Sequence, residues 1–144
     1  MIEIERIREV KMPERGTVNS AGIDLFIPDE FPKSVIFSNG SILIPMGIKV
    51  NIPSGTMLVI ENKSGIASKK SLIVGAKVID SDYHGEIMVN LHNIGMKDQI
   101  LTPGMKIVQM LHQPILLGEI YEGTNIHKYI RSERGEGGFG STGE

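Results

Sequence analysis

Short runs of alternating aliphatic and polar residues recur along most of the chain. A period of about two residues predicts β-strands, and the aliphatic positions that show it are Ile2, Ile4, Ile7, Ile42, Ile44, Ile48, Val50, Met57, Val59, Ile87, Val89, Leu91, Ile107, Val108 and Leu111. Turn signals such as Asn39-Gly40 and Pro103-Gly104 separate the runs. Short strands with frequent turns predict an all-β fold, either a sandwich or a barrel of antiparallel strands.

Two segments depart from this pattern. Residues 64–70 predict one short helix, with Ser64 as its candidate N-cap and with Lys69 and Lys70 at the end where the helix dipole favours cations. Residues 131–144 contain five glycines among small and charged side chains, a composition typical of a flexible tail. We therefore expect one β domain over residues 1–130 and a separate C-terminal segment over residues 131–144.

Composition narrows the range of functions. A chain of 144 residues with 40% apolar residues has the size and the core of one domain. The net charge of -2 provides no basic field for nucleic acid or membrane, so we expect a small ligand. The absence of Cys excludes disulfides, thiolate zinc sites and a cysteine nucleophile. The first residues lack the apolar run of a signal sequence or membrane span, which predicts a soluble, untargeted protein.

The C-terminal segment combines four kinds of group that bind nucleotides. Arg134 can pair with phosphate, Ser141 can donate to it, glycines let backbone N–H groups approach an anion, and Phe139 can stack on a base. On composition alone, the same residues also fit a solvated chain end. Together they favour a lid that closes over a nucleotide.

A carboxylate pair follows one of the predicted strands. Asp80 and Asp82 come directly after the apolar pair Val78-Ile79, and an Asp-x-Asp pair before a glycine also fits a simple turn. The end of a strand is nevertheless a rigid place from which to hold a carboxylate against a water molecule. Asp80 is therefore a candidate general base.

Three further polar sites interrupt or border apolar sequence. Lys63, Ser64 and Gly65 fit either an anion site or a plain helix cap. Asp24 lies inside an apolar strand, where it either satisfies local backbone groups or serves the charge of a ligand. Gln109 interrupts another apolar run and needs hydrogen-bond partners, in the fold or on the ligand. The four histidines lack the spacing of a zinc site.

In chain order, these segments resemble the five motifs of the trimeric dUTP pyrophosphatase (dUTPase) family. They are AGIDL at 21–25, NKSGIA at 62–67, GAKVIDSDYHGEI at 75–87, GMKIVQM at 104–110 and RGEGGFGSTG at 134–143. The third and the last are the most specific, and the resemblance covers nearly the whole chain. It implies a jelly-roll-like β-barrel, a homotrimer whose active sites draw on all three subunits, and hydrolysis of dUTP to dUMP and pyrophosphate.

The resemblance also implies a role for each motif residue. Asp80 would activate the water that attacks the α-phosphorus, and Mg2+ would be held by the triphosphate and water, with Asp24 touching the metal through water only. Tyr83 would pack under deoxyribose and exclude a ribose 2′-hydroxyl. The other substrate-binding positions are the uracil hairpin and its border, Gly75, Lys77, Val78, Ile79 and Met88; the phosphate contacts, Lys63, Ser64, Gly65 and Gln109; and the lid residues, Arg134, Phe139, Gly140 and Ser141.

Three residues depart from the pattern of the family. Lys63 stands where many members carry Arg, which keeps the charge but loses the planar two-pronged geometry. Lys77 stands where some members have Gly, so a positive φ at this position would strain the backbone. Ile23 stands where an aromatic residue is common, a change expected to alter packing only.

Other functions fit the same scaffold. dCTP deaminases and their bifunctional relatives share it but lack a glycine-rich lid with a Phe. A binding or regulatory protein could retain the fold without catalysis, or a dUTPase could add a regulatory partner. A capsid-like jelly roll would explain the strands but not the lid. For any of the enzymes, the expected location is the cytoplasm, or the host cytoplasm if the protein is viral.

Overall fold

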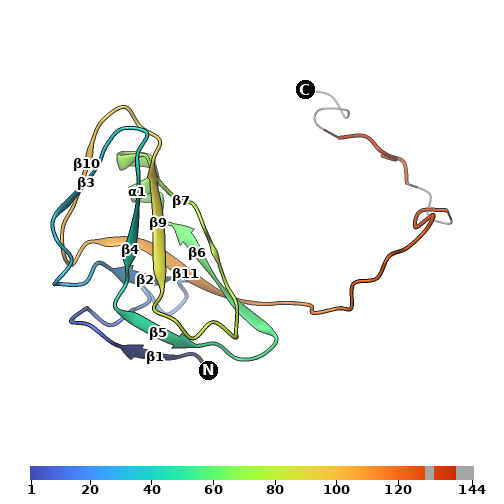
Figure 1. Cartoon of the computed structure of the whole chain (residues 1–144), viewed down its shortest axis with the longest axis horizontal. Coiled ribbons are helices and arrows are strands. Elements are labelled where there is room, and N and C mark those ends of the chain that lie inside the picture. Colours follow the sequence, from blue (N-terminus) through green and yellow to red (C-terminus); the bar gives the residue numbers. More distant parts are fainter. Residues whose placement is uncertain (129–131, 139–144) are drawn as a thin grey trace.

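The computed structural model describes residues 1–128 and 132–138 of the chain (Figure 1). This part consists mostly of strands, with one short helix, so the predicted all-β class is confirmed. The elements are β1 Glu3–Arg6, β2 Ile23–Phe26, β3 Ser34–Ile36, β4 Ser41–Pro45, β5 Ile48–Asn51, β6 Thr56–Asn62, α1 Ser64–Lys70, β7 Leu72–Val74, β8 Val78–Ile79, β9 Met88–Asn93, β10 Gln99–Leu101 and β11 Lys106–Pro114.

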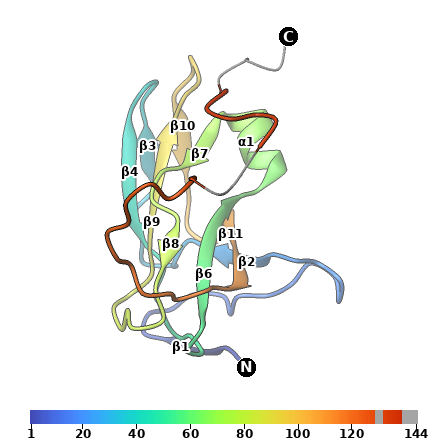
Figure 2. The same cartoon turned by 90° about the vertical axis from the view of Figure 1, so that its right-hand side faces the viewer.

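The strands of the described chain pair antiparallel in four small sheets. Their orders are β1-β5, β10-β3, β2-β11-β6-β8 and β4-β9-β7. The longest ladder joins β6 to β11, from Val108 opposite Asn62 to Pro114 opposite Thr56, and Figure 2 shows β8 lying beside β6. Pairing between strands far apart in the sequence gives a jelly-roll-like arrangement. Within the described residues, the sheets do not close into one continuous hydrogen-bonded ring.

The alternating pattern builds one core. In β5, Ile48 and Val50 are buried while Lys49 and Asn51 are exposed. Because neighbouring side chains of a strand point to opposite faces, the buried side chains of the different strands meet in the core between the sheets. Each large aliphatic side chain that leaves water stabilises the fold by roughly 1.5–3 kcal/mol. The polar side chain of Asn93 is buried as well, and its Nδ2 donates to the carbonyls of Ile36 at 2.9 Å and Lys97 at 2.8 Å.

The helix is confirmed as Ser64–Lys70, but the prediction that Ser64 caps it was wrong. Lys63 occupies the N-cap in extended backbone, and no side-chain cap hydrogen bond is formed there in the described structure. The carbonyl of Lys63 accepts the first helical hydrogen bond from the N–H of Ala67 at 2.9 Å. Ser64 therefore already has helical backbone and cannot cap. At the other end, Ser71 adopts φ 53° and accommodates the turn into β7.

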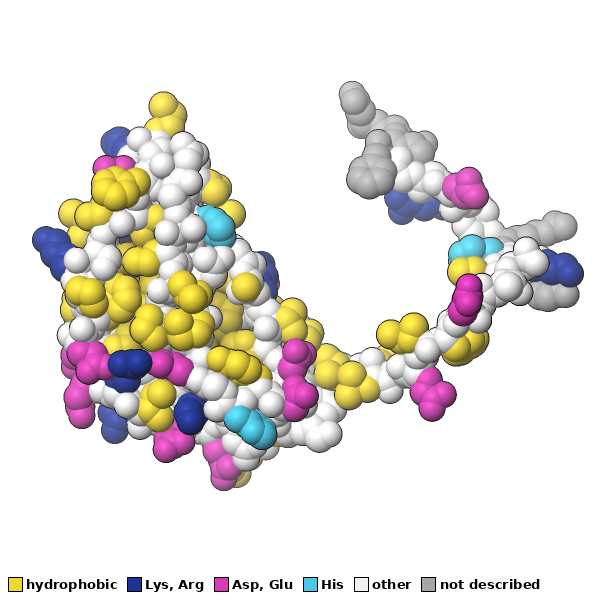
Figure 3. All heavy atoms as spheres, viewed as in Figure 1, with side chains coloured by type: hydrophobic (Ala, Val, Ile, Leu, Met, Phe, Trp, Pro, Cys, Tyr) yellow, Lys and Arg dark blue, Asp and Glu magenta, His cyan; other side chains and the backbone are white. Residues whose placement is uncertain are grey.

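After β11 the chain leaves the body of the molecule as an extended arm (Figure 1). We call residues 115–128 the C-terminal arm. Figure 3 shows hydrophobic side chains along it, and Leu116, Ile120 and Tyr121 are 101%, 100% and 86% exposed. The expected domain boundary at residue 130 falls on residues 129–131, outside the described residues, and stays a prediction. In the described chain, no helix has the length and apolarity needed to cross a membrane.

Candidate active site

Asp24 is buried on β2 and pairs with two lysines. The Nζ atom of Lys63 lies 2.5 Å from Oδ1 of Asp24, and that of Lys106 lies 2.9 Å from Oδ2. Burial by itself raises the pKa of Asp24, but the hydrogen bonds and charges of Lys63 and Lys106 outweigh it and hold the pKa below its ordinary value. Asp24 is therefore an ionised carboxylate between two cations.

Gln109 lies beside this carboxylate on β11, opposite Asp24 on one neighbouring strand and Glu61 on the other. Its Nε2 donates to the carbonyl of Asn62 at 2.9 Å, so the predicted need for a partner is met within the fold. Gly22 provides the space, because a Cβ at that position would lie 1.9 Å from Oε1 of Gln109. The sheet thus brings together the motifs around residues 24, 63 and 109.

Residues 75–79, predicted to form the hairpin that receives the base, connect β7 to β8. The prediction of a hairpin was wrong, because β7 pairs with β9 and β8 pairs with β6, in different sheets. The N–H of Gly75 donates to the carbonyl of Asn90 at 2.9 Å, and the carbonyl of Lys77 accepts from the N–H of Ile60 at 2.8 Å. Lys77 does not have a positive φ, unlike three other non-glycine residues of the described chain, so the strain considered for this position does not arise. Its Nζ instead pairs with both carboxylate oxygens of Glu61 at 3.0 Å.

A cavity of about 170 Å³ opens where β8 ends, and all of its lining residues are predicted site residues: Val78, Ile79, Asp80, Tyr83 and Met88. Asp80 is exposed on its wall. The hydroxyl of Tyr83 donates to the carbonyl of Glu86 at 2.8 Å, which fixes the ring at one side. The structure thus assembles a carboxylate, an aromatic ring and apolar contacts from residues 78–83 and from Met88 at the start of β9.

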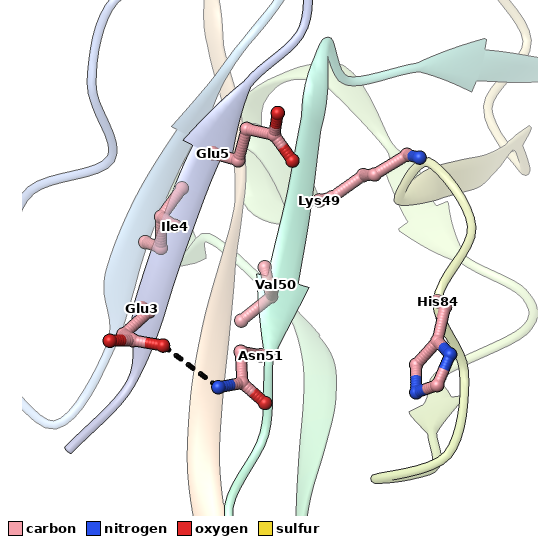
Figure 4. A pocket seen from close by; sticks show the side chains of 7 residues that line it. All are labelled: Glu3, Ile4, Glu5, Lys49, Val50, Asn51 and His84. Atoms are coloured by element: carbon pink, nitrogen blue, oxygen red, sulfur yellow. Dashed lines mark hydrogen bonds between the residues drawn. The ribbon is translucent and has the colours of Figure 1, made fainter.

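A second cavity, of about 440 Å³, lies on the outer face of β1 and β5 (Figure 4). Glu3, Lys49 and Asn51 line it from the two strands, and His84 approaches from the loop after Tyr83. Glu3 accepts a hydrogen bond from Nδ2 of Asn51 at 2.8 Å. None of the predicted site residues lines this cavity, so its larger size does not make it the better candidate.

Comparison with known proteins agrees with the arrangement of these motifs. A model of the dUTPase family matches residues 8–143. The chain belongs to the dUTPase family. Deoxyuridine 5′-triphosphate nucleotidohydrolase of Yarrowia lipolytica is 39% identical over 133 residues, which are 92% of this chain and 82% of that protein. The protein of the same name from Rickettsia prowazekii is 41% identical over 138 residues, covering 92% of this chain and 88% of the relative.

Solved structures of the family share the fold. A G164S mutant of the dUTPase of Staphylococcus bacteriophage 80alpha, determined with dUpNHpp, matches 100% of this chain and 99% of its own with a TM-score of 0.90 and 24% identity. The dUTPase of phage phi11 of S. aureus, whose structure visualises a species-specific insert, matches 90% of this chain and 99% of its own with a TM-score of 0.81 and 21% identity. The jelly-roll-like fold predicted from the family motifs is therefore confirmed.

The two halves of the candidate site do not meet within one chain. Lys63 is held at Asp24 on β2, whereas Asp80 follows β8, and these strands form opposite edges of one four-stranded sheet. Three strand spacings of about 4.8 Å separate the edges, and Ile79 lies opposite Leu58, about four residues or roughly 13 Å along β6 from Asn62. Asp80 and Lys63 of the same chain are therefore well separated on this sheet.

The lid residues are placed only in part. Arg134 donates from Nε to the carbonyl of Gly137 at 2.8 Å, and Gly135 has a positive φ of 52°. Arg134 is not among the residues that line the cavity at Asp80. Phe139, Gly140 and Ser141 lie outside the described residues. Ser64 and Gly65 are exposed at the start of α1.

The structure adds a residue that sequence reasoning did not select. Lys106 contacts Asp24 across the sheet, and its pKa is raised by the hydrogen bond and the charge of that carboxylate. The register of β2 against β11 places Lys106 opposite Phe26, two positions from Asp24. The only signal in the sequence that could have selected Lys106 was its place inside the motif at 104–110. Its contact with Asp24 depends on strand register, which cannot be read from one sequence.

Proposed function

We propose that this chain hydrolyses dUTP to dUMP and pyrophosphate with Mg2+, as a homotrimer whose active sites combine residues of different subunits. One observation carries the proposal: Asp80 and Tyr83 share a cavity with the end of β8 in a chain of the dUTPase family. Relatives named deoxyuridine 5′-triphosphate nucleotidohydrolase align with most of the chain, which supports the same substrate. A cytoplasmic location belongs to the proposal, and the absence of cysteine is compatible with it.

In this reaction the Asp80 carboxylate accepts a proton from a water molecule while the water oxygen forms a bond to the α-phosphorus. The bond from that phosphorus to the bridging oxygen breaks, and pyrophosphate leaves with its electron pair. General-base assistance of this kind contributes about 10²–10⁴-fold. Asp80 can reach such a water because its side chain is exposed at a fixed strand end, beside the cavity.

The cavity also accounts for substrate selection. The backbone of the connection between β7 and β8, around Gly75, would bind the uracil edge. Val78, Ile79 and Met88 would provide the apolar border of that site. Tyr83, held against the backbone at Glu86, would lie under deoxyribose and leave no room for a 2′-hydroxyl. Lys63, Ser64, Gly65 and Gln109 would contact phosphate oxygens, and the lid would bring Arg134, Phe139, Gly140 and Ser141 over the nucleotide.

The donor set fits a magnesium ion that arrives with the triphosphate. The described residues include no group of three or more His, Asp or Glu able to hold a metal, and both oxygens of Asp24 already contact lysines. A carboxylate oxygen accepts more than one hydrogen bond, so Asp24 can still receive one from a metal-bound water. When bound, Mg2+ would neutralise charge that moves toward the leaving group.

Two observations support the trimer. The phosphate-binding candidates lie at the end of β6 and on β11, whereas Asp80 follows β8, which pairs with β6 about four residues or roughly 13 Å from Asn62. This separation favours a site that is completed by residues of a second chain. The C-terminal arm exposes large apolar side chains, including Leu116, Leu117 and Ile120, which contiguous surface on another subunit would bury.

Subunit mixing tests this sharing directly. Assayed at dUTP concentrations well below KM, chains with Lys63→Met and chains with Asp80→Asn are each expected to lose most activity alone. Unfolding them together and refolding them as mixed trimers should restore part of it, since a site can then take Asp80 from one chain and Lys63 from another. The control is the same treatment of each variant by itself. Mixed trimers with no recovery would show that sites are not shared in this way.

A further inference from the structure

The loop between β8 and β9 carries Asp80 and Tyr83 and is open on two sides. Tyr83 lines the proposed substrate cavity, whereas the next residue, His84, lines the cavity over β1 and β5 (Figure 4). Within the loop, the N–H of Tyr83 donates to the carbonyl of Asp80 at 3.1 Å. Because this loop has a cavity on each side, the ring of Tyr83 keeps one position only if contacts with the rest of the fold hold the loop.

Glu86 provides that anchor through its side chain. Its carboxylate accepts hydrogen bonds from Arg8, with Nε at 2.7 Å from Oε1 and Nη2 at 3.1 Å from Oε2. The N–H of Gly47 donates to Oε1 as well, at 2.8 Å. The Glu86 side chain is 17% exposed. A two-pronged guanidinium contact is directional as well as charged, so it fixes both the position and the rotation of the carboxylate.

Glu86 also holds Tyr83, through its backbone. The carbonyl of Glu86 accepts the hydroxyl of Tyr83 at 2.8 Å. Gly85 lets the phenol approach, because a Cβ at residue 85 would lie 2.4 Å from the Tyr83 hydroxyl oxygen. One residue thus connects the ring to Arg8, which belongs to a segment far away in the sequence.

Arg8 is itself held in place. The N–H of Ile7 donates to the carbonyl of Gly47 at 2.8 Å, and Nη1 of Arg8 contacts Glu30 at 2.7 Å. The hydrogen bond from Arg8 is the largest cause that lowers the pKa of Glu86, ahead of the opposing effect of burial. The carboxylate therefore stays ionised and paired over the pH range of an ordinary assay.

We propose that Arg8 and Glu86 are positioning residues that hold Tyr83 against the sugar and thereby set the discrimination between deoxyribose and ribose. The inference rests on the proposed function, in which Tyr83 packs under the deoxyribose. Neither Arg8 nor the Glu86 carboxylate lines the substrate cavity. Their effect is transmitted through the Glu86 carbonyl and the Tyr83 hydroxyl, and small displacements of a positioned group reduce selectivity strongly.

The test compares dUTP with UTP as substrates for the full chain with Mg2+. Arg8→Met and Glu86→Gln are each expected to lower the dUTP/UTP ratio of kcat/KM by about tenfold or more, chiefly through a lower KM for UTP because a displaced ring no longer excludes the 2′-hydroxyl, with kcat for dUTP within about threefold. Tyr83→Phe, which removes the donor to Glu86, should reduce the ratio in the same way. Arg8→Lys keeps the charge without the two-pronged contact and should give an intermediate ratio.

Glu30→Gln is the matched control, because it removes a carboxylate from Arg8 without touching Glu86. It should leave the ratio unchanged, because the amide oxygen of the introduced glutamine can still accept from Nη1 and both contacts of Arg8 with Glu86 remain. Thermal unfolding of each variant separates a loss of fold from a loss of selectivity, and Glu86→Gln preserves the side-chain shape if Arg8→Met does not fold. Variants that fold and keep the dUTP/UTP ratio of the unmodified chain would overturn this inference alone. An unmodified chain without dUTP hydrolysis would overturn the proposed function, and this inference with it.

Discussion

The Nζ atom of Lys63 lies 2.5 Å from Oδ1 of Asp24, so a residue proposed to bind phosphate is already held by an opposite charge. An ammonium can divide its donors between carboxylate and phosphate, but it lacks the planar fork that would bind both in fixed directions. Hydrogen bonds to charged groups contribute about 1.5–3 kcal/mol. We expect Lys63→Met to raise the KM for dUTP roughly tenfold or more and Lys63→Arg to lower it, as measured by steady-state kinetics. An unchanged KM in Lys63→Met would remove Lys63 from the phosphate site.

Asp24→Asn should destabilise the fold even without ligand. The change removes the negative charge between Lys63 and Lys106 while the site stays buried, and we expect the free energy of unfolding at pH 7 to fall by about 2–3 kcal/mol. Urea unfolding followed by circular dichroism measures it. Asp29→Asn, a change at an exposed aspartate, is the control and should be neutral.

The destabilisation caused by Asp24→Asn should depend on pH. The pKa of Asp24 is lower in the folded than in the unfolded chain, so its contribution is complete above the ordinary pKa near 3.8 and is lost as the pH falls through the lowered folded value. The difference in unfolding free energy between the unmodified chain and Asp24→Asn should therefore be constant from about pH 5 to 8 and should shrink below about pH 4. A difference in unfolding free energy that grows as the pH falls would contradict a lowered pKa of Asp24 in the folded chain.

Gly75→Ala should impair the connection between β7 and β8 that is proposed to bind the base. An added Cβ would lie 2.2 Å from Oδ1 of Asn90 and 2.5 Å from Nε2 of His92, which are hydrogen-bonded to each other, so either these two side chains or the backbone at residue 75 must shift. A shift of this kind in a binding loop costs about tenfold to a hundredfold in kcat/KM for dUTP. Gly16→Ala, where the nearest atom would be 3.7 Å away, is the control. Equal kinetics for the two variants would show that the connection between β7 and β8 tolerates the added methyl group.

Replacing Leu116 and Leu117 by Ser should weaken the trimer. Both side chains lie on the C-terminal arm and are 101% and 78% exposed within the described part of the chain. Sedimentation velocity should show a larger monomer fraction at low protein concentration for the double variant than for the unmodified chain. Val18→Ser, which changes an exposed side chain outside the arm, serves as comparison. An unmodified chain that sediments as a monomer at all concentrations would refute the assembly itself.

Local sequence patterns predicted much of the fold. The alternation at Ile48 and Val50 determines which face of β5 is buried, and the helix at 64–70 follows from its own residues. The N-cap residue was predicted wrongly, because a Ser side chain suggests a cap, whereas the carbonyl of Lys63 accepts the first helical hydrogen bond from the N–H of Ala67. Asp80 was selected because it follows the apolar pair at a predicted strand end, and Tyr83 was selected from the family resemblance; the two line one cavity because they lie close together in the sequence.

Contacts between distant strands could not be predicted in the same way. The pairing of Lys106 with Asp24 depends on the register of β2 against β11, and the contact of Arg8 with Glu86 depends on the path of the N-terminal segment. Both are set by packing of the whole core. The family resemblance assigned Asp24, Lys63, Gln109 and Asp80 to one kind of active site, but only the sheet order shows that β2 with Asp24 and β8 before Asp80 are opposite edges of one sheet.

The most direct test of the central claim is release of pyrophosphate from dUTP, dTTP, dCTP and UTP with Mg2+, for the intact chain and for Asp80→Asn. The proposed function predicts rapid release from dUTP only, and a loss of about 10²–10⁴-fold in Asp80→Asn with dUTP binding retained. Omission of Mg2+ should strongly reduce the rate. Ammonia released from dCTP, or equal rates for Asp80→Asn and the unmodified chain, would contradict it.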